Sequence, residues 1–149
     1  MKVTKRPADL QEPMPMPDPY FPIKVHHTIF DAYGQVTFNS HWHQHFEMHY
    51  VLAGEASVDI NSKRWELRPG DIAVINCNDL HSGICLSERL EYYALIADLT
   101  LLHSSTTDPV DAKFILPLLH NRIVFRNKVA DREDIGREVA AIHRELKDR

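Results

Sequence analysis

Apolar and polar side chains alternate along most of residues 23–99, with a period of two. Successive side chains of a strand point to opposite faces, so this period predicts half-buried β-strands. Turn sequences at Asn61-Ser62 and at Pro69-Gly70-Asp71 separate several of them. The predicted strands include residues 35–39, 55–61, 64–67, 72–75 and 90–99. About seven short strands at this spacing predict a mainly β fold, either a sandwich or a small barrel.

The hydrophobic period changes after residue 108. Residues 111–119 predict a short helix that breaks near Pro117, and residues 131–147 predict a longer one, with Asp131 in its first turn. An apolar stripe lies on one face of the longer helix and consists of Ile135, Val139, Ile142 and Leu146. Two interpretations of this stripe stay open: it packs against the β domain, or it contacts a second copy of the chain.

Residues 1–22 contain six of the nine prolines. Proline has no N–H group and biases the preceding residue toward extended backbone, so this segment is predicted to be an extended arm. One interpretation is a disordered tail. The other is an arm that packs over the barrel, with four anchoring side chains: Met14, Met16, Tyr20 and Phe21.

Composition and charge are those of one globular domain. The 149 residues are 44% apolar and 26% charged, and the formal net charge is −4. Domains that hold phosphates are usually basic, so we do not expect this segment to bind nucleic acid itself. No signal peptide or membrane span is evident, so we expect a cytoplasmic location.

The two cysteines follow from this expected location. The thiols of Cys77 and Cys85 should be reduced and packed as small side chains.

Histidine is unusually frequent, with ten residues in the chain, and four of them lie between positions 41 and 49. Residues i and i+2 of a strand share a face, so His41 and His43 are expected to converge, and Glu47 has the same parity. His81 follows the predicted strand 72–75, which can bring it beside them. Three imidazoles and one carboxylate predict a site for Zn, Fe, Mn, Ni or Co. The alternative is a polar pocket lining that hydrogen-bonds a ligand or water.

Four further residues are candidate contacts for a small effector. His45 and His49 can reach the same pocket by parity, and Trp42 and Tyr92 offer aromatic faces of the kind that hold sugar rings. The remaining histidines are predicted to be surface or packing residues: His26, His27, His103, His120 and His143.

Two segments resemble the paired motifs of cupins. The first runs from His41-Trp42-His43 through Glu47 to Gly54, and the second runs from Gly70 to His81. The resemblance implies a double-stranded β-helix barrel over residues 23–108, with His41, His43, Glu47 and His81 as metal ligands. The chain departs from the enzyme-type pattern at three positions where many cupins have Pro, Gly and Asn: Asn76, Asn78 and Cys85.

The stretch HWHQHFEMHYVLAGEASVDINSKRWELRPGDIAVINCNDLHS is similar to the sugar-sensing half of AraC-type bacterial transcription regulators. This resemblance covers about residues 20–149. It implies an arm over residues 1–22, an effector-binding barrel, and a helical dimerisation segment over residues 109–149. It also implies a homodimer that reaches DNA only through a helix-turn-helix part, which is expected to be absent from this chain.

The leading hypothesis is therefore a non-enzymatic sensor of a small effector such as a sugar. A metal-dependent cupin enzyme, either a dioxygenase or an isomerase, is the main alternative, because a catalytic metal needs three or four protein ligands and an open position. The C-terminal helices count against it, since a minimal cupin enzyme does not require them. A third alternative is a metal-binding or storage protein without chemistry.

Overall fold

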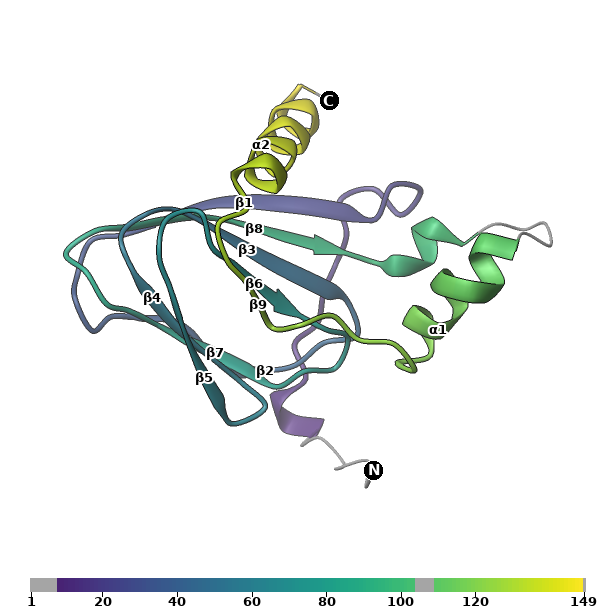
Figure 1. The fold of residues 1–149 in the computed structure, drawn as a ribbon, viewed down its shortest axis with the longest axis horizontal. Helices are drawn as coiled ribbons and strands as arrows, with labels where there is room; N and C mark the ends of the chain where they lie inside the picture. The colour runs from purple at the N-terminus through teal and green to yellow at the C-terminus, as the bar shows by residue number, and fades with distance from the viewer. Residues whose placement is uncertain (1–7, 104–108, 149) are drawn as a thin grey trace.

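Two antiparallel β-sheets pack face to face in the computed structural model, which describes residues 8–103 and 109–148 (Figure 1). The five-stranded sheet has the order β1 (Ile23–Phe30), β8 (Leu90–Ala97), β3 (Phe46–Ala53), β6 (Ile72–Ile75), β9 (Lys128–Val129). The four-stranded sheet has the order β2 (Val36–His41), β7 (His81–Cys85), β4 (Ala56–Ile60), β5 (Lys63–Leu67). The predicted mainly β fold is confirmed, and its strands form two sheets.

The inner faces of both sheets form the main hydrophobic core. In β4, Ala56, Val58 and Ile60 are buried, as their alternation with polar residues predicts. Cys85 packs fully buried in the same core and Cys77 is half-buried, and both are free thiols. The prediction that they are small packed side chains is confirmed.

Tight turns define the strand register. Asn61 and Ser62 both have positive φ, at 51° and 69°, and join β4 directly to β5 as a two-residue hairpin. Gly54 also has a positive φ of 77°, and a Cβ there would collide with the carbonyl of Arg89. Glycine is therefore required where β3 leaves the sheet.

The arm lies against the barrel from the 3-10 helix η1 (Ala8–Leu10) onward, while residues 1–7 lie outside the described part of the chain. Met14, Met16 and Phe21 are half-buried, which agrees with the interpretation of a packed arm. Tyr20 is 97% exposed, so its predicted anchoring role is wrong. The turn over residues 18–21, closed by a bond from Phe21 N to the Asp18 carbonyl, directs this side chain outward.

The C-terminal segment is partly helical. A π-helical turn, η3 (Asp111–Ile115), leads directly into α1 (Leu116–Leu119), so the helix passes through Pro117 and ends at Leu119, close to the predicted break. The chain then returns through β9, which pairs with β6 and extends the sheet beyond the expected barrel limit at residue 108. This strand was not predicted from the sequence.

The longer helix, α2 (Glu133–Lys147), begins two residues later than predicted. Asp131 has a φ of 60° and its N–H donates to Asp71 Oδ1, so it belongs to the preceding turn and not to the first turn of the helix. Physically, a left-handed residue cannot continue an α-helix.

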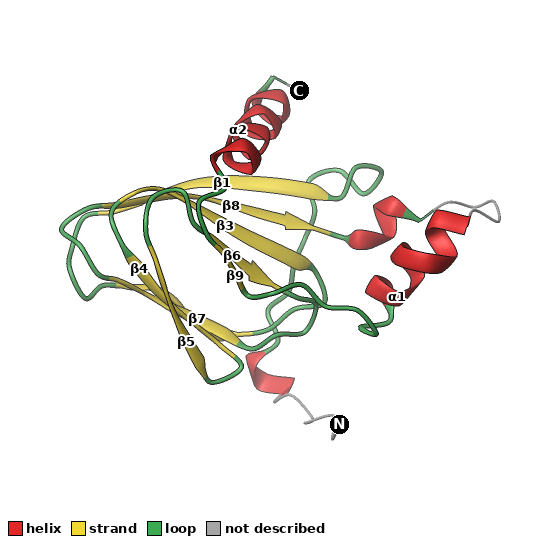
Figure 2. Cartoon of the chain, viewed as in Figure 1, coloured by secondary structure: helices red, strands yellow, loops and turns green. Residues whose placement is uncertain are grey.

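Helix α2 covers the outer face of the five-stranded sheet over β1 and β8 (Figures 1 and 2). Val139 is 3% exposed, and Ile135 and Ile142 pack beside it against the sheet. The packing interpretation of the apolar stripe is therefore confirmed for these three residues. None of the helices within residues 8–103 and 109–148 has the length and hydropathy of a membrane span.

Candidate metal centre

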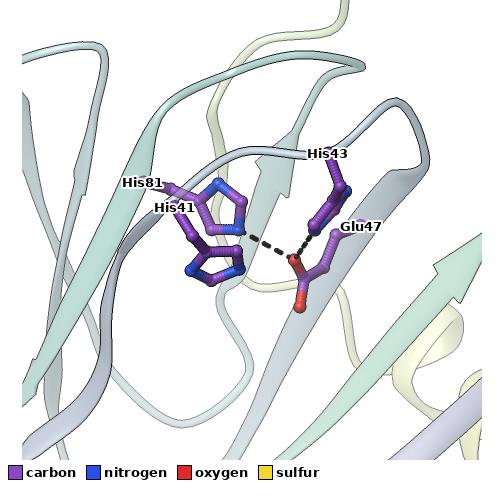
Figure 3. Close-up of side chains that lie close together, drawn as sticks. All are labelled: His41, His43, Glu47 and His81. Atoms are coloured by element: carbon purple, nitrogen blue, oxygen red, sulfur yellow. Dashed lines mark hydrogen bonds and ion pairs between the residues drawn. The ribbon is translucent and has the colours of Figure 1, made fainter. Parts of the chain in front are cut away.

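Four side chains from separate elements converge inside the barrel, as Figure 3 shows. His41 is the last residue of β2, Glu47 lies on β3, and His81 is the first residue of β7. His43 lies in the connection between β2 and β3. One donor atom from each residue lies within 4.8 Å of the donor atoms of the other three. Of the four, His41 alone is not fully buried.

The convergence has a different cause from the one predicted. His41 and His43 do not lie on one strand, because β2 ends at His41, so that part of the prediction is wrong. His43 instead reaches the site from a loop. His81 faces His41 directly across the β2–β7 pair, and their ring centroids are 4.1 Å apart.

Backbone carbonyls orient all three imidazoles of the site. The bonds join His41 Nδ1 to Asn39 O (2.7 Å), His43 Nδ1 to His45 O (2.9 Å), and His81 Nδ1 to Asp79 O (2.7 Å). A carbonyl only accepts, so each Nδ1 carries a proton and the lone pair of the neutral ring lies on Nε2. In metal-binding histidines, Nδ1 is typically bonded to a carbonyl in this way and Nε2 is the coordinating nitrogen.

Glu47 is the centre of the hydrogen-bond network. Its Oε2 lies 3.0 Å from Nε2 of both His43 and His81, and its Oε1 lies 2.9 Å from Nε2 of His49. Burial by itself would raise the pKa of Glu47, but the charge of His49 and the hydrogen bonds from the three imidazoles hold the pKa well below its ordinary value. The side chain is therefore a carboxylate.

The donor set fits a divalent metal ion. His43 and His81 each face two acceptors, a carbonyl at Nδ1 and the Glu47 carboxylate at Nε2, and a neutral imidazole can donate to only one of them. A metal ion bound by Nε2 and by the carboxylate removes this conflict while the rings stay neutral. The 3.0 Å separations from Glu47 are also those of neighbouring donors on one metal with bonds of about 2.1 Å.

The protonation of His41 also suits metal binding. Burial lowers its pKa most strongly, with a further contribution from His81, against the opposing effects of the Asn39 hydrogen bond and nearby carboxylates. His41 is therefore neutral at physiological pH, which is the form that coordinates a metal.

A cavity of about 250 Å³ adjoins the site at two of its four residues, His41 and Glu47. Its lining includes His41, Glu47, His49 and Tyr92, together with Met14 of the arm. Burial raises the pKa of Tyr92 most strongly, and the charge of Glu47 raises it further. The hydroxyl of Tyr92 therefore stays protonated beside the carboxylate. The cavity thus combines a metal-type donor set with an aromatic wall.

The structure separates the four candidate effector contacts into two pairs. His49 and Tyr92 line the cavity, whereas Trp42 and His45 are not among the described residues that line it. Trp42 pairs with the arm through its backbone, and the His45 carbonyl accepts the bond from His43 Nδ1.

Sequence reasoning missed the contribution of β1 to the cavity. Lys24, His26, Thr28 and Phe30 all line it, and they alternate along one strand. His26 had been predicted as a surface or packing residue, although the period of two across residues 24–30 was a usable signal. His27, on the opposite face, instead contacts Glu91 at 2.8 Å.

Comparison with known proteins now gives a family and a fold. Residues 26–149, well over half of the chain, match the family model described as AraC-like ligand binding domain. No protein with curated annotation matches the sequence. A cupin protein from Bacteroides fragilis is 21% identical with a TM-score of 0.50, over 59% of this chain and 75% of that one, which supports the cupin-type barrel.

Two further solved structures are similar over about half of this chain or more. KdgF from Halomonas sp. is 25% identical, with a TM-score of 0.48, over 51% of this chain and 68% of that one. A deletion mutant of Bacillus subtilis oxalate decarboxylase is 23% identical, with a TM-score of 0.47, over 62% of this chain and 25% of that one.

Proposed function

This chain belongs to the family of AraC-like ligand binding domains, and from that premise we propose that it is the effector-sensing and dimerisation domain of a bacterial transcription regulator. In this proposal the domain catalyses no reaction and works in the cytoplasm. DNA is contacted through a helix-turn-helix part outside residues 1–149. The cavity beside the four-residue site is the effector pocket.

The proposal includes a divalent transition metal held by His41, His43, Glu47 and His81. The observation that carries it is the orientation of the three imidazoles, each with Nδ1 bonded to a carbonyl and Nε2 left for a metal. When bound, the metal supplies a Lewis-acidic centre for oxygen atoms of the effector. Zn, Ni, Mn and Fe all suit imidazole-plus-carboxylate sites.

The size and lining of the cavity support a small, polar effector such as a monosaccharide. Its volume of about 250 Å³ is below the ~300 Å³ at which pockets for drug-sized molecules begin. Tyr92 and Phe38 offer apolar ring faces, and His49 and Glu47 offer polar groups, which together match a sugar ring and its hydroxyls. His49 and Tyr92 are the proposed direct contacts. Trp42 and His45 would act through the arm and His43.

The metal proposal is tested on protein purified without a histidine tag. Elemental analysis and calorimetric titration with Zn²⁺, Ni²⁺ and Mn²⁺ should find one metal per chain. His81→Ala should weaken binding about 100-fold or more, since even residues that only orient a ligand contribute about 10- to 100-fold. His143→Ala, a histidine on α2 outside the site, is the control and should bind normally. Equal metal affinity in His81→Ala would refute the assignment.

The effector proposal is tested by thermal melting of the metal-loaded protein against aldoses, ketoses and uronic acids. At least one sugar should raise the melting temperature, because a ligand that binds only the folded state stabilises it. His49→Ala and Tyr92→Phe should reduce that gain. If no sugar in the panel changes the melting temperature, a sugar effector is ruled out.

A metal-dependent cupin enzyme remains the second candidate function, because the four-residue site is complete and borders a cavity. The same sugar mixtures, followed by NMR and by oxygen uptake with the Fe²⁺-loaded protein, distinguish the two functions. A sensor leaves the sugar unchanged. Conversion that disappears in His81→Ala would instead establish an isomerase or dioxygenase.

A further inference from the structure

Glu12, on the arm, contacts the metal centre at the edge of the cavity. Its Oε2 lies 2.9 Å from Nε2 of His41, and its side chain is 49% exposed. Nδ1 of His41 is already bonded to the Asn39 carbonyl, so Nε2 is the nitrogen that remains for a metal. An arm carboxylate therefore contacts the nitrogen through which the barrel would bind its metal.

Backbone pairing fixes Glu12 in this position. The N–H of Glu12 donates to the Trp42 carbonyl at 2.9 Å, and the N–H of Trp42 donates to the Leu10 carbonyl at 3.0 Å. Gln11 and Trp42 form a parallel bridge between these two bonds. Trp42 stands between His41 and His43 in the sequence, so the arm is in register with two of the proposed ligands.

We propose that Glu12 is a fifth protein ligand to the metal, carried by the arm. This inference rests on the proposed binding of a metal by the four-residue site. The distance from Glu12 to His41 nearly equals the 3.0 Å from Glu47 to His43 and to His81, the separation of neighbouring donors on one metal. Glu12 is not within the 4.8 Å group formed by the other four donors, so coordination requires its half-exposed side chain to rotate toward the site. Two carboxylates also balance the charge of a divalent ion.

A consequence is that metal binding and arm docking stabilise each other. If the arm supplies a ligand, a loaded metal holds residues 10–12 against Trp42, and a docked arm raises metal affinity by the same factor. Glu12 and Met14 both line the cavity, so this coupling also determines whether its arm-side wall is in place. The metal would thereby prepare the pocket for its effector.

The test compares Ni²⁺ binding by the wild-type chain, Glu12→Gln and Asp9→Asn, all without a tag. Glu12→Gln should bind Ni²⁺ about 10- to 100-fold more weakly by calorimetry, since it removes one ligand. Asp9→Asn removes an equal charge from the same arm and should bind like wild type. Metal-free Glu12→Gln should melt like wild type, because Glu12 is half exposed.

Hydrogen–deuterium exchange gives the second readout. Ni²⁺ should slow exchange in the peptide that contains Glu12 in the wild-type chain, and should not do so in Glu12→Gln. Equal Ni²⁺ affinities of wild type and Glu12→Gln would overturn the role of Glu12 while leaving the metal centre intact. Faster arm exchange with Ni²⁺ would also overturn it, because the metal would then displace the arm. A wild-type chain that binds no Ni²⁺, Zn²⁺ or Mn²⁺ would overturn the metal centre itself.

Discussion

At the residue scale, the carboxylate of Glu47 is the shared acceptor of three buried histidines. It accepts hydrogen bonds from His43, His49 and His81, all of which are buried. Leaving a buried donor without its acceptor costs about 1–3 kcal/mol, and more where one group is charged. Glu47 therefore stabilises the metal-free protein.

The pH dependence of stability follows from these groups. The pKa of Glu47 is depressed in the folded state, so its contribution is fully present above the ordinary value of 4.5 and is lost as the pH falls through the depressed pKa. Burial chiefly lowers the pKa of His41, so the unfolded state binds its proton more readily and stability also declines below pH 6.5. Both effects destabilise the metal-free protein in acid.

Glu47→Gln measures the first effect. With a chelator present, urea unfolding should show the variant about 3 kcal/mol less stable than wild type at pH 7. The difference should shrink as the pH falls from 4.5 toward the depressed pKa of the folded state, because the unfolded wild-type chain then takes up a proton at Glu47 before the folded chain does. A difference that stays constant between pH 7 and pH 3 would show that the charge of Glu47 has no such role.

At the element scale, the position of α2 depends on a close contact with β3. Gly136 of the helix lies against the ring of Tyr50, and a Cβ on Gly136 would overlap that ring. Glycine is a poor helix former, by about 1 kcal/mol relative to alanine. Its presence in the first turn of α2 is explained by this approach to the sheet.

Gly136→Ala should therefore destabilise the protein although it improves helix propensity. Overpacking costs about 1–3 kcal/mol, so we expect a lower free energy of unfolding in urea. Glu138→Ala, an exposed position on the same helix, should change stability by no more than about 0.5 kcal/mol. A more stable Gly136→Ala variant would mean that α2 can move away from Tyr50 without cost.

At the scale of the whole molecule, exposed apolar side chains gather in the segment between the barrel and α2. Val110, Phe114, Val124 and Phe125 are between 46% and 60% exposed. Ile135, Val139 and Ile142 of the α2 stripe already pack against their own sheet, so these three side chains are not free to join two chains. Exposed apolar patches commonly mark interfaces, and we therefore assign the proposed dimer contact to this part of residues 109–149.

If the chain forms the proposed dimer, the paired substitution Phe114→Asp and Val124→Asp should convert it to a monomer in sedimentation experiments at micromolar concentration. Charges placed in a self-complementary contact face each other across the symmetry axis and repel. Tyr33→Asp, at another exposed aromatic residue, should leave the dimer intact. A wild-type chain that is monomeric throughout would remove dimerisation from the proposal.

Much of the fold and of the candidate site could be predicted from the sequence, because the signals are local. The period of two locates most strands, Asn61-Ser62 provides a hairpin turn, and the identities of His41, Glu47 and His81 define the donor set. The start of α2 was predicted less accurately than the strands. A turn held by Asp71, from another part of the chain, determines where this helix begins.

The sequence alone determined which chemical groups are available for a site and in which segments apolar and polar residues alternate as in a strand. Only the tertiary structure decided where they meet: His43 enters from a loop, His81 pairs opposite His41, and Tyr92 rather than Trp42 faces the cavity. The pairing of β9 and the contact of Glu12 with His41 were likewise decided at this level. The physical reason is that these contacts join residues far apart in the sequence, and sheet closure, which no local pattern encodes, sets which faces turn inward.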